Sequence, residues 1–184
     1  MKTTVNQYRK LIAVGSLAAI FLLASLLLGI LFSLSFHDGI GSYHAWKMGG
    51  EFLGKEGVVL QDKPNNCGPA ALKMIFDHFE IPARLMEIEQ HVDLTHRGSS
   101  MLALKEMAEL KGLKAEGWRY TLEDFLKAPM PAIVFVHDDH FAVVDSVSID
   151  QQVYVRDPAL GKLKIPVKKL PRIWNGETLI IRRQ

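Results

Sequence analysis

The chain has 184 residues, which allows one domain of ordinary size with an appendage and excludes a large multidomain assembly. Its 22 basic and 20 acidic residues include no basic run longer than two, so the chain lacks the charge pattern of a nucleic-acid-binding protein. A single cysteine excludes an intramolecular disulfide and any cysteine-rich metal site. We therefore expect no cofactor, no metal and no nucleic-acid partner, and a lone thiol whose surroundings decide its role.

The distribution of charge predicts a membrane anchor near the N-terminus. Residues 11–36 contain no charged side chain, and 20 of these 26 residues are apolar. As a helix they extend about 39 Å, enough to cross a hydrocarbon core of about 30 Å. The stretch is longer than the apolar region of a signal peptide and lacks a cleavage site, which favours an uncleaved transmembrane helix. Lys2, Arg9 and Lys10 predict a cytoplasmic N-terminus and an extracytoplasmic domain, as in a single-pass protein of the bacterial inner membrane.

The rest of the chain divides into a linker and one folded domain. Residues 37–54 contain five glycines and no periodic pattern, so they predict a flexible tether. The residues that follow have the apolar content of a domain that buries a core. The expected organisation is a cytoplasmic N-terminus at 1–10, an anchor at 11–36, the tether at 37–54 and the domain at 55–184.

The domain begins with helical patterns and ends with strand patterns. Gly68–Glu80 predicts a helix with Pro69 in its first turn, because apolar residues recur at intervals of three and four. Further helices are predicted at Ala83–His91 and from Ser99 or Ser100 to Gly112, and Thr121 can cap a short fourth. Strands are predicted at Ala132–Val136, Phe141–Val147, Val153–Arg156, Leu163–Ile165 and Thr178–Ile181. Helices followed by antiparallel strands predict an α+β domain.

Cys67 stands at the start of the first helix predicted in this domain. The unpaired amides and the positive dipole end of a helix N-terminus favour a thiolate there. Gly68 is expected to leave room for a substrate carbonyl, and the Cys67 amide with the Gln61 side chain would hold its oxyanion. The local pattern alone is equally compatible with a small buried cysteine that has no chemical role.

A nucleophilic cysteine needs a base and a group that orients the base. Among the seven histidines, His140 begins an apolar strand that would hold its ring, whereas His137 fits a hairpin turn. If 140–147 and 152–157 form a hairpin centred on residues 148–151, the numbers of paired residues sum to 299. Asp157 is then opposite Ala142, and His140, two residues before Ala142, is its diagonal neighbour on the same face. Asp157 is therefore predicted to orient the base, or alternatively only to begin an Asp-Pro turn.

Taken in order, Gln61-x5-Cys67-Gly-Pro-Ala, then His140-Phe-Ala-Val-Val, then Asp157-Pro resembles the bacteriocin-processing cysteine peptidases. Those papain-like enzymes cut leader peptides after a double glycine, usually as the N-terminal domain of a peptide-exporting ABC transporter. The resemblance covers about residues 58–182 and implies a papain-like fold and a peptide or protein substrate. It implies Cys67 as nucleophile, His140 as base and then acid, Asp157 as orienting residue and Gln61 as oxyanion donor.

Several alternatives stay open at this level. No transporter or ATPase pattern accompanies the domain, so an export system would act in trans, and the predicted topology places the domain outside the cytoplasm. The substrate is therefore either a double-glycine leader or a secreted protein. The same residues also suit a transglutaminase- or amidase-type acyl transferase, and the fold suits a catalytically silent binding adaptor. A double glycine at Gly49-Gly50 raises the hypothesis of self-release from the anchor, with a flexible linker as the simpler interpretation.

Overall fold

The computed structural model describes the backbone of residues 2–184 and the side chains of residues 17, 19–33 and 38–184. The chain forms two compact units, Met1–Gly39 and Ile40–Gln184. Helix α1 (Lys2–Lys47) contains the predicted anchor, of which the side chains at 11–16, 18 and 34–36 lie outside the described residues. Within the described part, Ala19–Lys47 is long and apolar enough to cross a membrane.

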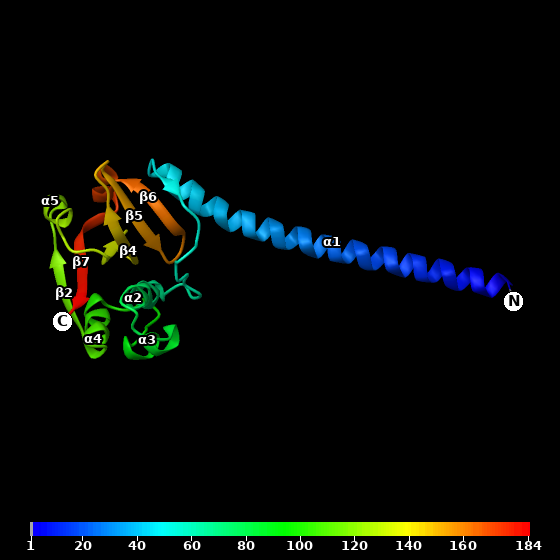
Figure 1. Cartoon of the computed structure of the whole chain (residues 1–184), viewed down its shortest axis with the longest axis horizontal. Helices are drawn as coiled ribbons and strands as arrows, with labels where there is room; N and C mark the ends of the chain where they lie inside the picture. The colour runs from blue at the N-terminus through cyan, green and yellow to red at the C-terminus, as the bar shows by residue number, and fades with distance from the viewer. Residues whose placement is uncertain (1) are drawn as a thin grey trace. The chain divides into compact units, whose positions relative to one another are not determined.

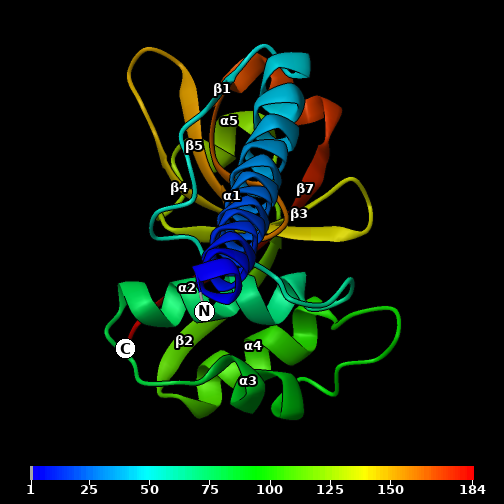
Figure 2. The same cartoon turned by 90° about the vertical axis from the view of Figure 1, so that its right-hand side faces the viewer.

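The second unit is an α+β domain, as predicted (Figures 1 and 2). Three helices come first: α2 (Cys67–His78), α3 (Leu85–His91) and α4 (Met101–Leu110). A short helix α5 (Leu122–Phe125) and a 3₁₀ helix η1 (Val167–Arg172) lie among the strands. The strands are β1 (Glu51–Phe52), β2 (Leu113–Arg119), β3 (Ala132–Val136), β4 (His140–Val147), β5 (Gln152–Asp157), β6 (Gly161–Pro166) and β7 (Trp174–Arg183).

The seven strands form one antiparallel sheet in the order β1-β6-β5-β4-β3-β7-β2. The β4–β5 hairpin has the predicted register at its open end, where Val143 pairs with Arg156 and Val144 with Val155. A bulge before Ser146 then shifts the pairing by one residue. An extra residue in one strand is the ordinary cause of such a shift, and it leaves the end that carries the predicted site in register.

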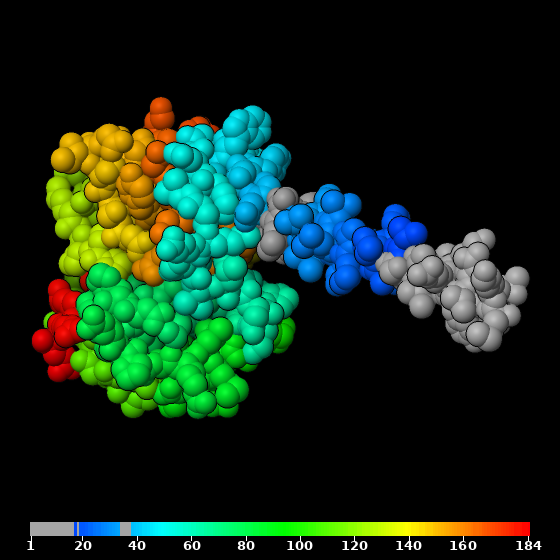
Figure 3. Space-filling view, turned by 45° about the vertical axis from the view of Figure 1, so that its right-hand side comes forward, coloured from blue at the N-terminus to red at the C-terminus, as the bar shows by residue number. Residues whose placement is uncertain are grey.

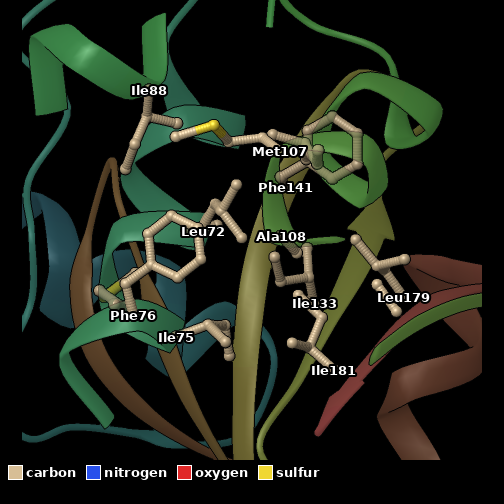
Figure 4. Packing of buried hydrophobic residues seen from close by; sticks show 14 of the residues in the cluster. Leu72, Ile75, Phe76, Ile88, Met107, Ala108, Ile133, Phe141, Leu179 and Ile181 are labelled. Atoms are coloured by element: carbon tan, nitrogen blue, oxygen red, sulfur yellow. The ribbon is translucent and has the colours of Figure 1, made fainter. Parts of the chain in front are cut away.

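Each face of the sheet covers a separate hydrophobic cluster. Helices α2, α3 and α4 pack on one face, where Leu72 and Phe76 of α2 meet Ile133 and Phe141 of the sheet (Figure 4). The other face packs against α5, η1 and the end of α1. Successive residues of a strand point to opposite faces, so Phe141 enters the first cluster while Ala142 enters the second.

Residues 40–54 differ from the predicted flexible tether because they are part of the second unit. Helix α1 continues to Lys47, and β1 pairs with β6 at the edge of the sheet. Ala45 is fully buried in the second cluster. Local glycine content gave no sign of this packing, because the contacts that order the segment come from residues more than a hundred positions away.

The two glycines at positions 49 and 50 have structural roles in that segment. The Gly49 amide donates to Trp46 O and the Gly50 amide to Ala45 O, both at 2.8 Å, which is a Schellman ending of α1. Gly49 has a φ of +69°, as this motif requires. A Cβ on Gly50 would lie 2.2 Å from the carbonyl oxygen of Lys164. The double glycine therefore serves a helix end and a close approach to β6.

Strand β2 was not predicted from the sequence. It pairs with β7 from Leu113↔Arg183 to Arg119↔Glu177. Only Leu113 and Ala115 are buried, so the alternation of apolar and polar residues is too short to mark a strand.

Candidate active site

Cys67 is the first residue of α2 and is 7% exposed. Its neighbour Gly68 is required by packing, since a Cβ there would lie 2.3 Å from Ser99 Oγ and 3.2 Å from a ring carbon of Phe141. The structure thus gives Gly68 a packing role, and the expectation that it leaves room for a substrate carbonyl stays a prediction. The missing side chain lets the start of α2 approach β4, the strand that begins with His140.

His140 and Asp157 meet as the predicted register requires. His140 Nε2 lies 3.0 Å from Asp157 Oδ1, and both side chains are largely buried. His140 follows the three-residue β3–β4 turn, where His137 and Asp138 both have positive φ, the combination found at the two central residues of a type I′ turn. β4 begins at His140 directly after this turn, where His140 pairs with Val136 of β3.

The Asp157 carboxylate is itself held in place. Its Oδ1 accepts hydrogen bonds from the amides of Ala159 at 2.8 Å and Leu160 at 3.1 Å. A side-chain oxygen that accepts from amides two and three residues later forms a local turn motif. The two interpretations of Asp157 left open by the sequence therefore hold together: the residue forms the turn after β5 and contacts His140.

The hydrogen bonds of this group shift the pKa values of both reactive side chains. Burial raises the pKa of the Cys67 thiol. Hydrogen bonds from His140 and from the amides of Phe141 and Gly68 together lower the pKa by more, so the net result is a value below the ordinary one. Burial lowers the pKa of His140, but its hydrogen bonds to Asp157 and Cys67 raise the value to about 10. These shifts favour a thiolate and imidazolium pair.

A protonated imidazole donates from both ring nitrogens. In His140, Nε2 faces Asp157, and Nδ1 is the nitrogen left for Cys67. The His140 ring therefore lies between two partners, Asp157 on one nitrogen and Cys67 on the other.

Gln61 lies next to this group through its backbone. Its amide donates to Pro158 O at 2.9 Å, directly after Asp157 in the chain. Its Nε2 donates to Lys63 O at 3.1 Å, while Oε1 is buried without a hydrogen-bond partner among the described residues. Gln61 is not among the residues that line the cavity beside Cys67, so its role as oxyanion donor stays a prediction.

Sequence reasoning missed a polar network directly before the nucleophile. Asn66 is fully buried, and its Nδ2 donates to Asp62 Oδ1 at 2.6 Å and to Glu89 Oε1 at 2.7 Å. Its Oδ1 accepts from the Lys63 amide at 3.2 Å, and Lys63 Nζ pairs with Glu89 Oε2 at 2.5 Å. The network ties the 61–66 loop to α3. The sequence shows an asparagine directly before Cys67, but neither its burial nor its contact with Glu89 has a local signal.

A cavity of about 650 Å³ opens beside Cys67, His140 and Asp157. Its walls are mainly apolar side chains of β3 to β6 and η1, and it extends to the end of α1 at His44, Lys47 and Met48. Such a hollow beside a reactive group is the usual form of a substrate site. Among the described residues, no three His, Cys, Asp or Glu side chains are placed to hold a metal ion.

A cysteine at a helix N-terminus, beside a histidine that contacts a carboxylate on an antiparallel sheet, is the arrangement of a papain-like cysteine peptidase. Comparison with known proteins agrees: a model of the Peptidase C39 family matches residues 55–184. The chain belongs to this family and is a cysteine peptidase.

Three similar proteins place the chain within that family. One is a solved structure of a double-glycine motif protease from an AMS/PCAT transporter in complex with the leader peptide, and it is 29% identical to this chain. The match covers 69% of this chain and 91% of the protease chain, with a TM-score of 0.67. A protein of Methanothermobacter thermautotrophicus is 29% identical over 131 residues, or 71% of this chain and 92% of its own. The "Probable functional amyloid protease FapD" of Pseudomonas aeruginosa is 30% identical over 65% of this chain, which spans 57% of that relative.

Proposed function

We propose that the chain hydrolyses peptide bonds with Cys67 as the nucleophile. The observation that carries this proposal is the hydrogen-bonded series Cys67–His140–Asp157, which joins the start of α2 to the start of β4 and the end of β5. The thiolate attacks the scissile carbonyl carbon, and the His140 imidazolium gives its proton to the leaving amine, which leaves a thioester. His140 then takes a proton from the water that attacks the thioester, and the acid product leaves as the thiolate is restored. Asp157 holds the ring throughout.

Gln61 is proposed as a donor to the oxyanion, together with the Cys67 amide. One Nε2 hydrogen of Gln61 binds Lys63 O, so the second is available. Removing one oxyanion donor typically lowers kcat by about 10²- to 10³-fold. We expect a loss of this size for Gln61→Ala with little change in KM, and an equal rate in both proteins would exclude the role.

The proposed substrate is a peptide or secreted protein with Gly-Gly before the scissile bond. This specificity is supported by the 29% identity to a double-glycine motif protease, and the amyloid-protease relative supports a secreted protein as the source. We further propose that residues 11–36 anchor the enzyme in the bacterial inner membrane, with the peptidase unit outside the cytoplasm and any export system acting in trans.

Cleavage tests the reaction directly. The full chain in detergent is incubated with a peptide containing Gly-Gly and with a matched peptide in which both glycines are replaced by valine, and the products are weighed by mass spectrometry. We expect cleavage after Gly-Gly only, lost in Cys67→Ala and His140→Ala. An added amine found in the product would favour the acyl transferase. Peptide binding without cleavage by the wild-type chain would favour the adaptor.

Topology is tested separately. A reporter enzyme that is active only outside the cytoplasm, fused after Gln184, is expected to be active. A reporter that works only in the cytoplasm should be inactive at the same position. The opposite pair of results would place the peptidase unit inside the cell and would exclude the proposed location.

A further inference from the structure

The residues directly before the family-matched region belong to the peptidase unit. The family match begins at residue 55, yet Ala45 is buried against the sheet and β1 is paired with β6. In the space-filling view this segment, in cyan, lies against the orange residues of the sheet edge (Figure 3). A segment that is fixed in this way can contribute permanent side chains to a binding site.

The segment supplies one wall of the cavity beside the nucleophile. His44, Lys47 and Met48 line the same hollow as Cys67 and His140. The opposite walls are apolar side chains of the sheet and of η1, with Val134, Ala142, Val144, Val155, Leu163, Ile165 and Leu170 among them. A substrate chain held there has an apolar surface beneath it and the end of α1 beside it.

The rim of this cavity carries an excess of positive charge. Lys47 comes from the end of α1, and Lys169 and Arg172 come from η1. Within the described part of the chain, none of these three cations is paired with a carboxylate. Apart from Asp157, which binds His140, Asp139 is the one carboxylate among the described lining residues.

The two sides of the cationic rim are close to one another. A Cβ added to Gly49, just past the end of α1, would lie 3.8 Å from Lys169 Cε. The Lys169 stem therefore runs beside the turn that ends α1, and the end of α1 also carries Lys47. Lys47 and Lys169 therefore belong to neighbouring elements at the rim of the same cavity.

We propose that this cavity is a specificity subsite for an acidic peptide segment, which places an apolar side chain on the sheet and a carboxylate at Lys47, Lys169 and Arg172. The inference rests on the proposed function, since it names the substrate chemistry of the same site. Unpaired cations over an apolar floor complement a chain that carries both kinds of side chain. Residues 44–48 thus act in substrate selection, although they lie outside the family-matched region.

The charge of the rim can be measured without knowing the substrate. Cys67 is the only cysteine, so its alkylation rate by anionic iodoacetate, divided by that of neutral iodoacetamide, reports the local potential. We expect Lys47→Glu and Lys169→Glu each to lower this ratio about two- to five-fold, and less at high salt. Lys168→Glu is the matched control, because Lys168 is exposed in η1 and does not line the cavity. The proposal is overturned if the iodoacetate-to-iodoacetamide ratio of Lys47→Glu and Lys169→Glu equals that of Lys168→Glu.

Substrate preference is tested with pairs of peptides that end in Gly-Gly. The two peptides of a pair differ at one position before the glycines, which is Glu in one peptide and Gln in the other, and this position is moved along the peptide from pair to pair. In at least one pair, we expect the full-length Cys67→Ala chain to bind the Glu peptide about two- to five-fold more tightly than its Gln partner. Adding Lys169→Glu to Cys67→Ala should abolish this preference. This binding arm supports the subsite even if the wild-type chain cleaves neither peptide, which would refute only the proposed function. Equal binding of the Glu and Gln peptides in every pair overturns the subsite. Displacement of the Glu peptide by vesicles of anionic phospholipid also overturns it, because this result assigns the cations to lipid headgroups.

Discussion

The strongest quantitative prediction concerns Asn66→Asp, a change of nearly equal size at a fully buried residue. In the wild type the Asn66 amide donates to two carboxylates, those of Asp62 and Glu89. The substitution replaces this donor with a third carboxylate. A hydrogen bond to a charged group contributes about 1.5–3 kcal/mol, and the exposed position of Asp62 places its share at the low end. We expect the free energy of unfolding to fall by about 2–4 kcal/mol near neutral pH.

The loss should depend on pH in one direction. Neighbouring carboxylates and burial raise the pKa of the introduced carboxyl above its unfolded value of about 3.9. Below the unfolded pKa the introduced carboxyl is protonated in both the folded and the unfolded state, so its charge costs the folded state nothing. As the pH rises through the folded pKa, the carboxyl ionises in the folded state and the free energy of unfolding falls. The difference between Asn66→Asp and the wild type should therefore be small near pH 4 and grow towards pH 7.

The assay is equilibrium urea unfolding of the full chain in detergent, followed by tryptophan fluorescence. Adding Glu89→Gln to Asn66→Asp restores a donor and acceptor pair between α3 and the loop, so we expect it to recover about 1 kcal/mol or more. Asn65→Asp is the control, because Asn65 bonds only to the Thr95 carbonyl and no carboxylate. A loss that is independent of pH, or that the second substitution deepens, would refute the proposed arrangement of charge.

Four further predictions concern the reactive pair and the end of α1. Because His140 lowers the pKa of Cys67, His140→Ala should move the midpoint of iodoacetamide labelling to higher pH, and an unchanged midpoint would argue against the contact. Asp157→Asn should lower the pKa of His140 from about 10 towards about 6.5, and the alkaline limit of peptide cleavage should fall with it in a pH–rate profile. Gly50→Ala places a Cβ against Lys164 O and should reduce the free energy of unfolding by about 1–3 kcal/mol in urea titrations, whereas Gly117→Ala, with nothing within 4 Å, should change it little. Since β1 holds this segment on β6, the wild-type chain and Cys67→Ala should both have the intact mass of residues 1–184, differing only by the substituted side chain. A wild-type mass lower by residues 1–50 would show self-release.

Much of the site could be predicted because its signals are local. Pro69 and the apolar repeat marked α2, and the alternation of apolar residues in β4 and β5 indicated the pairing that places Asp157 beside His140. The predicted register holds at the end of the hairpin that carries the site, although the bulge before Ser146 shifts the pairing beside the turn, so two residues seventeen positions apart could be paired from sequence.

The missed elements depend on distant partners. Strand β2 is defined by pairing with β7 rather than by its own pattern. Glu89 reaches Asn66 only because α3 packs beside the loop before α2. The segment at 40–54 has a glycine content typical of a linker, and its order comes from β6.

The sequence by itself determined that a cysteine at a helix start, a histidine at a strand start and an aspartate at a strand end could form one reactive group, because helix ends, strand alternation and hairpin register are local properties. Only the tertiary structure decided what surrounds that group. Burial of Asn66 between two carboxylates, and a cavity walled by the end of α1, need contacts between elements far apart in the chain. Such contacts depend on how faces pack in three dimensions, and no local pattern records them.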